Sequence, residues 1–282
     1  MRKVLTAIAL IIAGMALAIA VLPTLGIDFS WLSNRYEIEI YQFDEPVRQV
    51  IVQGADWDVF INPSFGGDEL EVFTSEQSRN YCDVDVTDGV LTVTRTDNRS
   101  WLDRLELGRE AYPYISLYLP EGSYELLALQ TDSGNIYMSY DEGYLAFDTV
   151  QLESGSGWIH YNDCPAETIT ARSGSGDVRL NEVTAGTVDV TTTSGDIDFD
   201  STAVSGELTA ETTSGDIWFW DSDAGSLQLK TASGDVWGNL LTPKNFETHT
   251  TSGDVDVPDS DKSAGLCSIT TSSGDIRLQV DE

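Results

Sequence analysis

An aspartate follows the glycine of a short Ser-Gly-Asp turn that recurs through the second half of the chain. Carboxylates stacked in such a row repel one another by roughly 1 kcal/mol per pair in water, and a calcium ion would relieve that repulsion. The glycine-rich nonapeptide of calcium-binding rolls is absent, so we expect each aspartate to hydrogen-bond its own turn and predict no metal site; calcium is the alternative. The row comprises Asn135, Trp158, Asp177, Asp196, Asp216, Asp235, Asp254 and Asp275.

Three tryptophans form the second candidate site. Trp218 and Trp237 each stand three residues after a turn glycine, and Trp220 lies two residues beyond Trp218. Alternate residues of a strand share one face, so all three are expected to point outward from adjacent repeats. Exposed aromatic rings on an acidic surface suit contacts with sugars or proteins. We predict ligand binding here; the alternative is that a loop, the membrane-proximal chain or a self-contact covers the rings.

The histidines give no sign of catalysis. His160 and His249 fall in different repeats, and neither has a cysteine or histidine partner at metal-ligand spacing. No glycine-rich loop leads into a helix, and the carboxylates are too numerous for spacing to select an acid–base pair. We therefore predict a non-enzyme with no catalytic residues and no cofactor, and keep a polysaccharide-active enzyme as an alternative.

The turns that carry these residues recur at a nearly constant period. Successive turn glycines are 23, 19, 19, 20, 19, 19 and 21 residues apart. Repeats of this length with alternating apolar residues are typical of stacked β-solenoids, whose single coils cannot bury their own apolar face. The glycines are Gly134, Gly157, Gly176, Gly195, Gly215, Gly234, Gly253 and Gly274.

Four positions of each repeat are almost wholly apolar, at two and four residues after the glycine and at five and seven before it. This spacing predicts two short strands per coil, one on either side of the turn, facing a common core. Glycine would permit a positive φ in the turn. A Ser or Thr stands three residues before every glycine, and we expect these hydroxyls to donate to one another along the stack.

The region before the repeats is β-rich without the strict period. Residues 47–52, 56–61, 69–74, 81–86, 90–94 and 114–119 are expected strands, and Asp88-Gly89 is typical of a hairpin turn. A solenoid needs its end coil covered, so we assign 46–120 as a cap, 121–282 as the repeats and 28–45 as a linker. Four arginines, Arg95, Arg99, Arg104 and Arg109, form a basic cluster that either pairs with acidic residues or contacts an anionic envelope component.

The N-terminus predicts export. Two basic residues precede an apolar run from Val4 to Leu22, which is long enough to cross a bilayer. We expect residues 1–27 to be a cytoplasmic start and an uncleaved transmembrane signal-anchor, with the rest outside the cytoplasm in a single-pass topology. The alternative is a cleaved signal peptide and secretion, because Ala18-Ile19-Ala20 fits a cleavage site.

The charge of the chain excludes one class of partner, and its cysteines raise the question of a disulfide. The net charge of −32 argues against nucleic acid, because phosphate binding needs a basic surface. Cys267 is expected as a small buried hydrophobe, and a Cys82–Cys164 disulfide is the one pairing we consider.

The chain resembles the bacterial "putative adhesin" family of β-strand-repeat, membrane-anchored proteins of unknown function. Matching features are the Pro113–Pro120 stretch and the serial Thr-Thr-Ser-Gly-Asp-Ile blocks at Thr192–Ile197 and Thr212–Ile217, and the resemblance covers about residues 45–280. It implies a β-repeat fold and no catalytic residues. Some members look like envelope-stress-associated membrane proteins, which would imply a sensor or accessory role.

These observations predict an all-β protein: a parallel two-sheet β-solenoid of about 19–21-residue coils with an N-terminal β-rich cap, preceded by one transmembrane helix. The predicted function is non-catalytic, an adhesin-like binding or structural module of the cell envelope. Its expected partners are the membrane, through the N-terminal helix, and an envelope glycan or a membrane protein. The alternative is an accessory or sensor component of an envelope-stress response that acts through a membrane partner.

Overall fold

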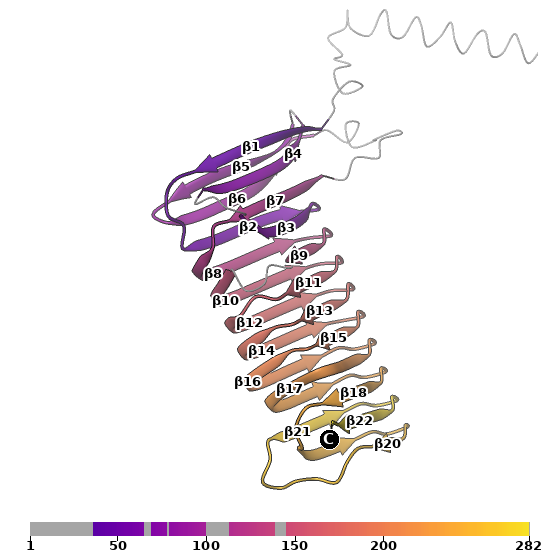
Figure 1. The fold of residues 1–282 in the computed structure, drawn as a ribbon. Coiled ribbons are helices and arrows are strands. Elements are labelled where there is room, and N and C mark those ends of the chain that lie inside the picture. The colour runs from indigo at the N-terminus through magenta and orange to yellow at the C-terminus, as the bar shows by residue number, and fades with distance from the viewer. Residues whose placement is uncertain (1–35, 65–68, 78, 100–112, 139–144, 282) are drawn as a thin grey trace, which may run out of the picture.

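The computed structural model describes residues 36–64, 69–77, 79–99, 113–138 and 145–281, and within them the chain is all-β, with no helix. Figure 1 shows the strands stacked across the long axis of an elongated, solenoid-like rod. The solenoid-like, all-β prediction is confirmed. The strands are β1 (Glu37–Phe43), β2 (Gln49–Ala55), β3 (Asp58–Pro63), β4 (Leu70–Glu76), β5 (Asn80–Thr87), β6 (Val90–Asp97), β7 (Tyr114–Leu119), β8 (Gly122–Thr131), β9 (Ile136–Met138), β10 (Leu145–Ser154), β11 (Ile159–Asn162), β12 (Ala166–Ser173), β13 (Val178–Asn181), β14 (Thr184–Thr192), β15 (Ile197–Asp200), β16 (Ala203–Glu211), β17 (Ile217–Lys230), β18 (Val236–Leu240), β19 (Asn245–His249), β20 (Val255–Asp256), β21 (Leu266–Thr270) and β22 (Ile276–Val280).

Within the described ranges, no helix is long and apolar enough to span a bilayer. The predicted span from Val4 to Leu22 lies outside those ranges.

The strands of each coil enter two parallel ladders. Strands that precede the turn pair with one another, as β10 does with β8 and β12, and form the pre-turn ladder. Strands that follow the turn pair likewise, as β11 does with β9 and β13, and form the post-turn ladder. The 14-residue β17 runs through the corner and pairs in both ladders, so all 22 strands belong to one hydrogen-bonded sheet.

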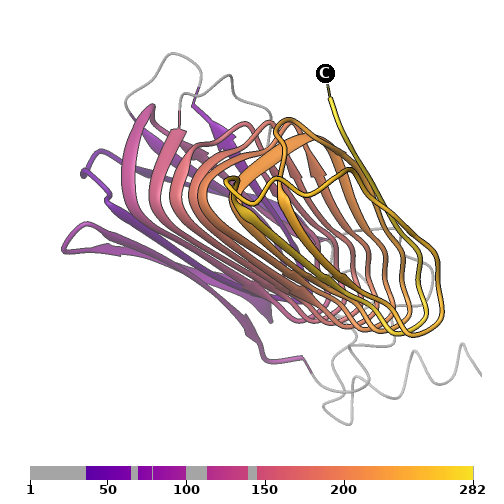
Figure 2. The same cartoon turned by 90° about the horizontal axis from the view of Figure 1, so that it is seen from below.

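The core lies between the two ladders, and Figure 2 shows the coils superposed around it. The four apolar columns predicted from the period are buried in every coil from Gly134 to Gly234 and in the Gly274 coil, apart from the glycine at position 238. In the Gly253 coil, by contrast, Val255 is 45% exposed. This coil ends the stack, so one side of its apolar residues has no neighbour.

The turn glycines are required by close approach rather than by backbone conformation. A positive φ was expected, but among the described glycines only Gly89, Gly122 and Gly238 have one. A Cβ added to Gly195 would lie 2.1 Å from the carbonyl oxygen of Gly176 in the preceding coil. The turns stack so tightly that only hydrogen fits between them.

The hydroxyl column does not form the hydroxyl-to-hydroxyl ladder that we expected. Thr192 Oγ1 accepts from the Gly195 amide at 3.1 Å and donates to the Gly176 carbonyl of the preceding coil at 3.4 Å. Ser154 repeats the pattern, donating to Gly134. Each of these hydroxyls thus satisfies a buried amide of its own turn and a carbonyl of the turn in the preceding coil.

The coils are not stacked in chain order at the C-terminal end. The strands of the last coil, β21 and β22, pair with β17 and β18 on one side and with β19 and β20 on the other. The Gly274 coil is therefore inserted between the Gly234 and Gly253 coils. The order of these coils in the stack therefore differs from their order in the chain.

A similar exchange occurs at the N-terminal end. Strands β2 and β3 form a coil of the parallel stack between the β6–β7 coil and the β8–β9 coil. Beyond them, β4 pairs antiparallel with β7, β5 with β6, and β1 with β4. These antiparallel strands cover the end of the stack, and β1 occupies residues 37–43 of the segment expected as a linker.

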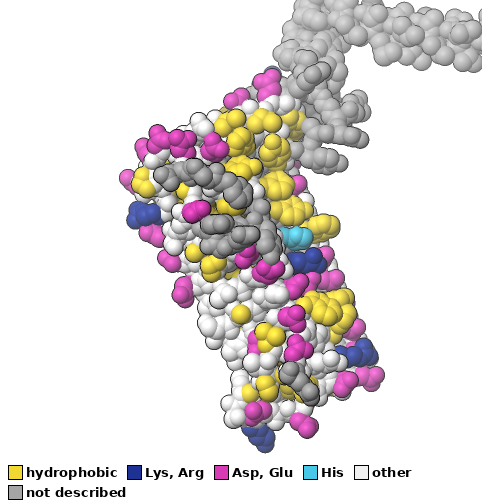
Figure 3. All heavy atoms as spheres, viewed as in Figure 1, with side chains coloured by type: hydrophobic (Ala, Val, Ile, Leu, Met, Phe, Trp, Pro, Cys, Tyr) yellow, Lys and Arg dark blue, Asp and Glu magenta, His cyan; other side chains and the backbone are white. Residues whose placement is uncertain are grey.

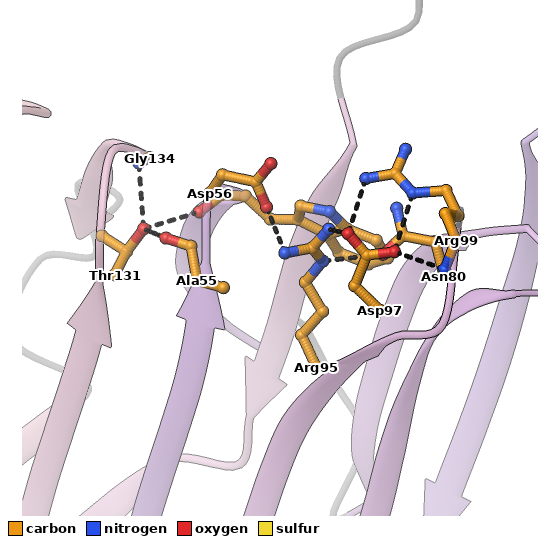
Figure 4. A network of polar contacts seen from close by, with 9 residues as sticks. Ala55, Asp56, Asn80, Arg95, Asp97, Arg99, Thr131 and Gly134 are labelled. Atoms are coloured by element: carbon orange, nitrogen blue, oxygen red, sulfur yellow. Dashed lines mark hydrogen bonds and ion pairs between the residues drawn. The ribbon is translucent and has the colours of Figure 1, made fainter. Parts of the chain in front are cut away.

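A group of ion pairs lies at the end of β6, the strand that pairs with β5 of the antiparallel end and with β2 of the stack (Figure 4). Arg95 pairs with Asp56 and with Asp97, the latter at 3.0 Å, and its guanidinium lies over the Trp57 ring. Arg99 Nε lies 2.9 Å from Asp97 Oδ1 and holds the pKa of that carboxyl at about 2. Both arginines are buried and paired with acidic residues; Arg104 and Arg109 lie outside the described residues.

The three cysteines are all buried, and none forms a disulfide, so the Cys82–Cys164 pairing is wrong. Cys267 packs in the core column expected for it, and burial raises the pKa of its thiol to about 12.

Candidate functional site

The three predicted tryptophans come together as one cluster on the post-turn ladder. The ring centroids of Trp218 and Trp237 are 3.9 Å apart, and that of Trp220 lies 6.3 Å from Trp218 and 5.6 Å from Trp237. Trp220 is 41% exposed, and the other two rings are half-buried. The cluster therefore presents a tilted, three-ring aromatic surface to solvent, which we call the tryptophan cluster.

Strand register produces this cluster. Trp218 in β17 is directly opposite Trp237 in β18, in adjacent coils. Trp220 occupies the end of the post-turn strand, where the equivalent residues of earlier coils are Asn162, Asn181 and Asp200. A register shift follows between Phe219 and Ser222, with Asp221 at a φ of 46°. The shifted backbone after Trp220 turns the chain at the corner beside the exposed ring.

An open groove of about 1170 Å³ runs past the tryptophan cluster. Its acidic lining comes from residues that follow the turns and from the ends of the last coils: Asp216, Asp221, Asp235, Asp256, Asp275 and Asp281. Arg277 also lines it, and its Nη2 lies 2.6 Å from Asp275 Oδ2. An aromatic floor with carboxylate borders can stack on flat ligands, accept hydrogen bonds and attract cations.

The aspartate row has a structural role that links neighbouring coils. Oδ1 of Asp177 accepts from the amide of Asp196 at 2.9 Å, and Oδ1 of Asp196 accepts from Asp216 at 2.8 Å. The amide that donates to each of these carboxylates thus lies in the adjacent coil, not in the aspartate's own turn as we expected. No three acidic, histidine or cysteine side chains in the described residues group into a metal site.

A second aromatic cluster lies on the same face, and sequence reasoning missed it. The Phe60 and Tyr137 rings stack at 5.3 Å with an interplanar angle of 10°. His160 meets the edge of Tyr137 at 5.3 Å and stacks with Trp158 at 6.1 Å. We call Phe60, Tyr137, Trp158 and His160 the upper aromatic cluster. The sequence pattern that could have revealed it is an aromatic residue three positions after each of two successive turn glycines, at Tyr137 and His160. Phe60 lies before the regular repeats and would not have been found in this way.

Figure 3 shows hydrophobic side chains gathered in two groups along one edge of the rod, with charged side chains between them. Trp158, which belongs to the upper aromatic cluster, is 51% exposed. A shallow depression between the groups is lined by Trp158, His160, Asp177, Arg179, Asp196, Asp198 and Trp218. The two clusters therefore border one continuous surface.

The histidines have environments that fit packing better than proton transfer. Burial and the nearby Arg179 lower the pKa of His160, which lies against Tyr137 and Trp158. His249 is exposed in the end coil, far along the stack from His160. The structure does not bring the two histidines together.

A second groove, of about 720 Å³, follows the corner where the chain enters the pre-turn strands. Small side chains form its floor in successive coils, including Ala166, Ala185 and Ala224, and the buried Lys244–Asp223 ion pair closes one end. It is hollow because small residues and glycines recur at this corner.

The stacked parallel coils define a β-solenoid, and its exposed aromatic face is the candidate site. The Toastrack DUF4097 family model matches residues 47–258 and again residues 206–282, so the chain belongs to this family. No curated protein is similar to the chain in sequence.

Solved structures share the fold. A "putative adhesin" from Parabacteroides distasonis is similar with a TM-score of 0.56 at 12% identity, covering 86% of this chain and 97% of its own. A "putative adhesin" from Bacteroides fragilis gives 0.53 at 13% identity, with the same coverage. A "putative lipid binding protein", also from P. distasonis, gives 0.47 at 14% identity, covering 86% and 97%. At these identities the likeness concerns the fold alone.

Proposed function

We propose that this protein is a non-catalytic, adhesin-like binding module of the cell envelope, and that the tryptophan cluster is its ligand-binding site. The observation that carries the proposal is the contact of three partly exposed indole rings on adjacent coils. Exposing such rings to water is unfavourable, and a ligand that covers them recovers roughly 25 cal/mol per Å² of buried apolar area.

The architecture supports binding rather than turnover. The site is an open surface on a stack of strands, whose register determines which side chains lie opposite one another. Such a surface suits recognition of an extended partner, whereas catalysis generally requires an enclosed site that excludes water. The two solved structures of similar fold whose names are "putative adhesin" support this proposal.

The proposed location is the outer side of the cell membrane, with residues 1–27 as a single-pass signal-anchor. The apolar run Val4–Leu22 after Arg2 and Lys3 supports it. A C-terminal fusion to alkaline phosphatase, which is active only outside the cytoplasm, should be active. A C-terminal fusion to a fluorescent protein that folds only in the cytoplasm should show no fluorescence. The reverse pattern would contradict the topology, and release of the fusion into the medium would favour signal cleavage and secretion.

Capture from native envelope tests the binding site. Full-length protein and the Trp218→Ala/Trp237→Ala variant are cross-linked in cells, purified in detergent and analysed for both glycans and proteins. We expect one envelope component to be captured by the wild type and lost from the variant. Tyr81→Ala, which removes an aromatic ring from β5 in the antiparallel end of the stack, is the matched control and should capture normally.

Two other results would assign the function elsewhere. Capture of the same membrane protein by wild type and variant would favour the accessory or sensor role in an envelope-stress response, because the rings would then be irrelevant. Cleavage of a supplied envelope polysaccharide, dependent on one carboxylate, would support the enzyme alternative and refute the proposal.

A further inference from the structure

We propose that the outward face of the post-turn ladder is one extended site for a linear polysaccharide of neutral or amino sugars, which contacts both aromatic clusters at once. This inference rests on the proposed function, because it assigns a ligand class and a second contact region to the site at the tryptophan cluster. It adds the upper aromatic cluster and the surface between them.

The first argument is register. The residue three positions after each turn lies directly opposite its equivalent in the next coil, without a shift, over seven coils of the stack. In spatial order this straight column reads Phe60, Tyr137, His160, Arg179, Asp198, Trp218 and Trp237. Aromatic rings thus occupy both ends, and a charged pair occupies the middle. A straight ligand lying along the rod axis would contact all of them.

The second argument is spacing. Strands in a ladder are about 4.8 Å apart, so His160 and Trp218, three coils apart, are separated by about 14 Å. By the same arithmetic the column from Phe60 to Trp237 spans about 29 Å. A pyranose ring in a linear chain has a length close to one strand spacing. An extended oligosaccharide can therefore place about one sugar over each coil, with stacking on aromatic rings at both ends.

The third argument is charge. The row of Asp177, Asp196, Asp216 and Asp235 runs beside the column along its whole lower part. A polyanionic glycan would be repelled by this row, whereas a neutral sugar or a protonated amino sugar would not. Ammonium groups would also be attracted to the tryptophan faces. The surface thus selects against acidic polymers.

The fourth argument is hydrogen-bonding capacity. In the described part of the chain, Oδ1 of Asp177, Asp196 and Asp216 is the atom engaged in linking coils. Oδ2 of each is then left to accept from a ligand hydroxyl or amine. Between the clusters, Arg179 Nη2 lies 2.7 Å from Asp198 Oδ2, on a side chain that is half exposed. Polar acceptors and donors alongside aromatic rings match the alternating polar edges and apolar faces of sugars.

Oligosaccharide binding to the full-length protein in detergent tests the proposal. Isothermal titration uses β-1,4-linked glucosamine and N-acetylglucosamine oligomers from dimer to hexamer, cello-oligomers, and an alginate hexamer as the acidic comparison. For the wild type we expect affinity to rise by at least tenfold between dimer and hexamer, and no measurable alginate binding. This length series needs no substitution, so it does not depend on any variant folding.

Variants then separate the two clusters. Tyr137→Ala should weaken hexamer binding by about fivefold and leave dimer binding at the tryptophan cluster unchanged, given about 1 kcal/mol per aromatic contact. Trp218→Ala/Trp237→Ala should weaken both. Tyr81→Ala is the matched control with normal binding, and the circular dichroism spectra of all variants should be unchanged.

Each contrary result is distinct. Equal affinity for dimer and hexamer, lost only in the tryptophan variant, would overturn the extended site but leave the proposed function intact. Equal binding of alginate would overturn the charge argument. Absence of binding to any glycan, with tryptophan-dependent binding of a cationic peptide, would overturn the ligand class. Absence of any effect of the tryptophan substitutions on a bound ligand would overturn both proposals.

Discussion

Replacing a single turn glycine by alanine should destabilise the whole stack. In Gly195→Ala the new methyl carbon would lie 2.1 Å from the Gly176 carbonyl oxygen and 2.5 Å from its carbon. Both atoms belong to the backbone of the adjacent coil, so no side-chain rotation can relieve the overlap. Ordinary van der Waals contact begins near 3.4 Å, and the turns would have to separate locally by more than 1 Å.

That separation would break interactions that join the two coils. The Asp196 amide donates to Asp177 Oδ1 at 2.9 Å, and Thr192 Oγ1 donates to the Gly176 carbonyl at 3.4 Å. At about 1 kcal/mol each, with a further 1–3 kcal/mol for overpacking, the expected loss is about 3 to 5 kcal/mol of unfolding free energy. Urea unfolding followed by circular dichroism measures it.

Two further variants isolate the cause. Ser194→Ala changes an exposed residue of the same turn and should shift the unfolding free energy by less than about 0.5 kcal/mol. Gly195→Asn separates close approach from backbone conformation, because asparagine tolerates a left-handed φ but still carries a Cβ. We expect Gly195→Asn to be at least as destabilising as Gly195→Ala. A loss below about 1 kcal/mol for either substitution would refute the reasoning.

Three other predictions follow from the described contacts. Thr192→Val should lower the unfolding free energy by about 1 to 3 kcal/mol, because it leaves the Gly195 amide and the Gly176 carbonyl without their hydroxyl partner. Thr192→Ser should be nearly neutral, since Ser154 makes the same bonds in its own coil. Thermal melts of both variants test these expectations. Burial raises the pKa of the Cys82 and Cys267 thiols, and Cys164 is also buried. Ellman's reagent at pH 8 should therefore react slowly with the native protein, whereas in denaturant it should react rapidly with all three thiols. Rapid reaction with the native protein would contradict the burial. Arg99 lowers the pKa of Asp97 from 3.8 to about 2. The ion pair therefore contributes its full stabilisation above about pH 4, and this contribution is lost as the pH falls through 2. As the pH is lowered from 6 to 2, the urea midpoint should decrease less steeply for Asp97→Asn than for the wild type.

Periodicity was enough to predict the core and the position of the tryptophan cluster. Alternation places Ile197 and Phe199 inward and Trp218 outward, and each lies where that pattern predicts. Register within a parallel stack follows once the turns are aligned, because a one-residue slip would move the apolar side chains to solvent. Local pattern and tertiary packing agree at these positions.

The order of coils and the details of the turns were beyond the sequence. Sequence spacing does not indicate which coil packs on which, and the Gly253 and Gly274 coils present similar apolar columns. Likewise, Phe60 joins the column of Tyr137 only because β3 pairs with β9, and the sequence between these two distant strands gives no sign of that pairing. Close approach at Gly195 depends on a neighbouring backbone, which a single repeat does not reveal.

The exchanged coil order also determines how the candidate site ends. If the coils stacked in chain order, Trp237 would lie beside Asp256, and the aromatic column would continue into a carboxylate. Instead Arg277 of the inserted last coil is directly opposite Trp237, and Asp256 lies one coil further away. A cationic sugar would therefore meet its most favourable surroundings near Trp218 and Asp216 rather than at the Arg277 end. Arg277, which is paired with Asp275, thus follows Trp237 in the stack, and the aromatic column of the extended site ends at Trp237.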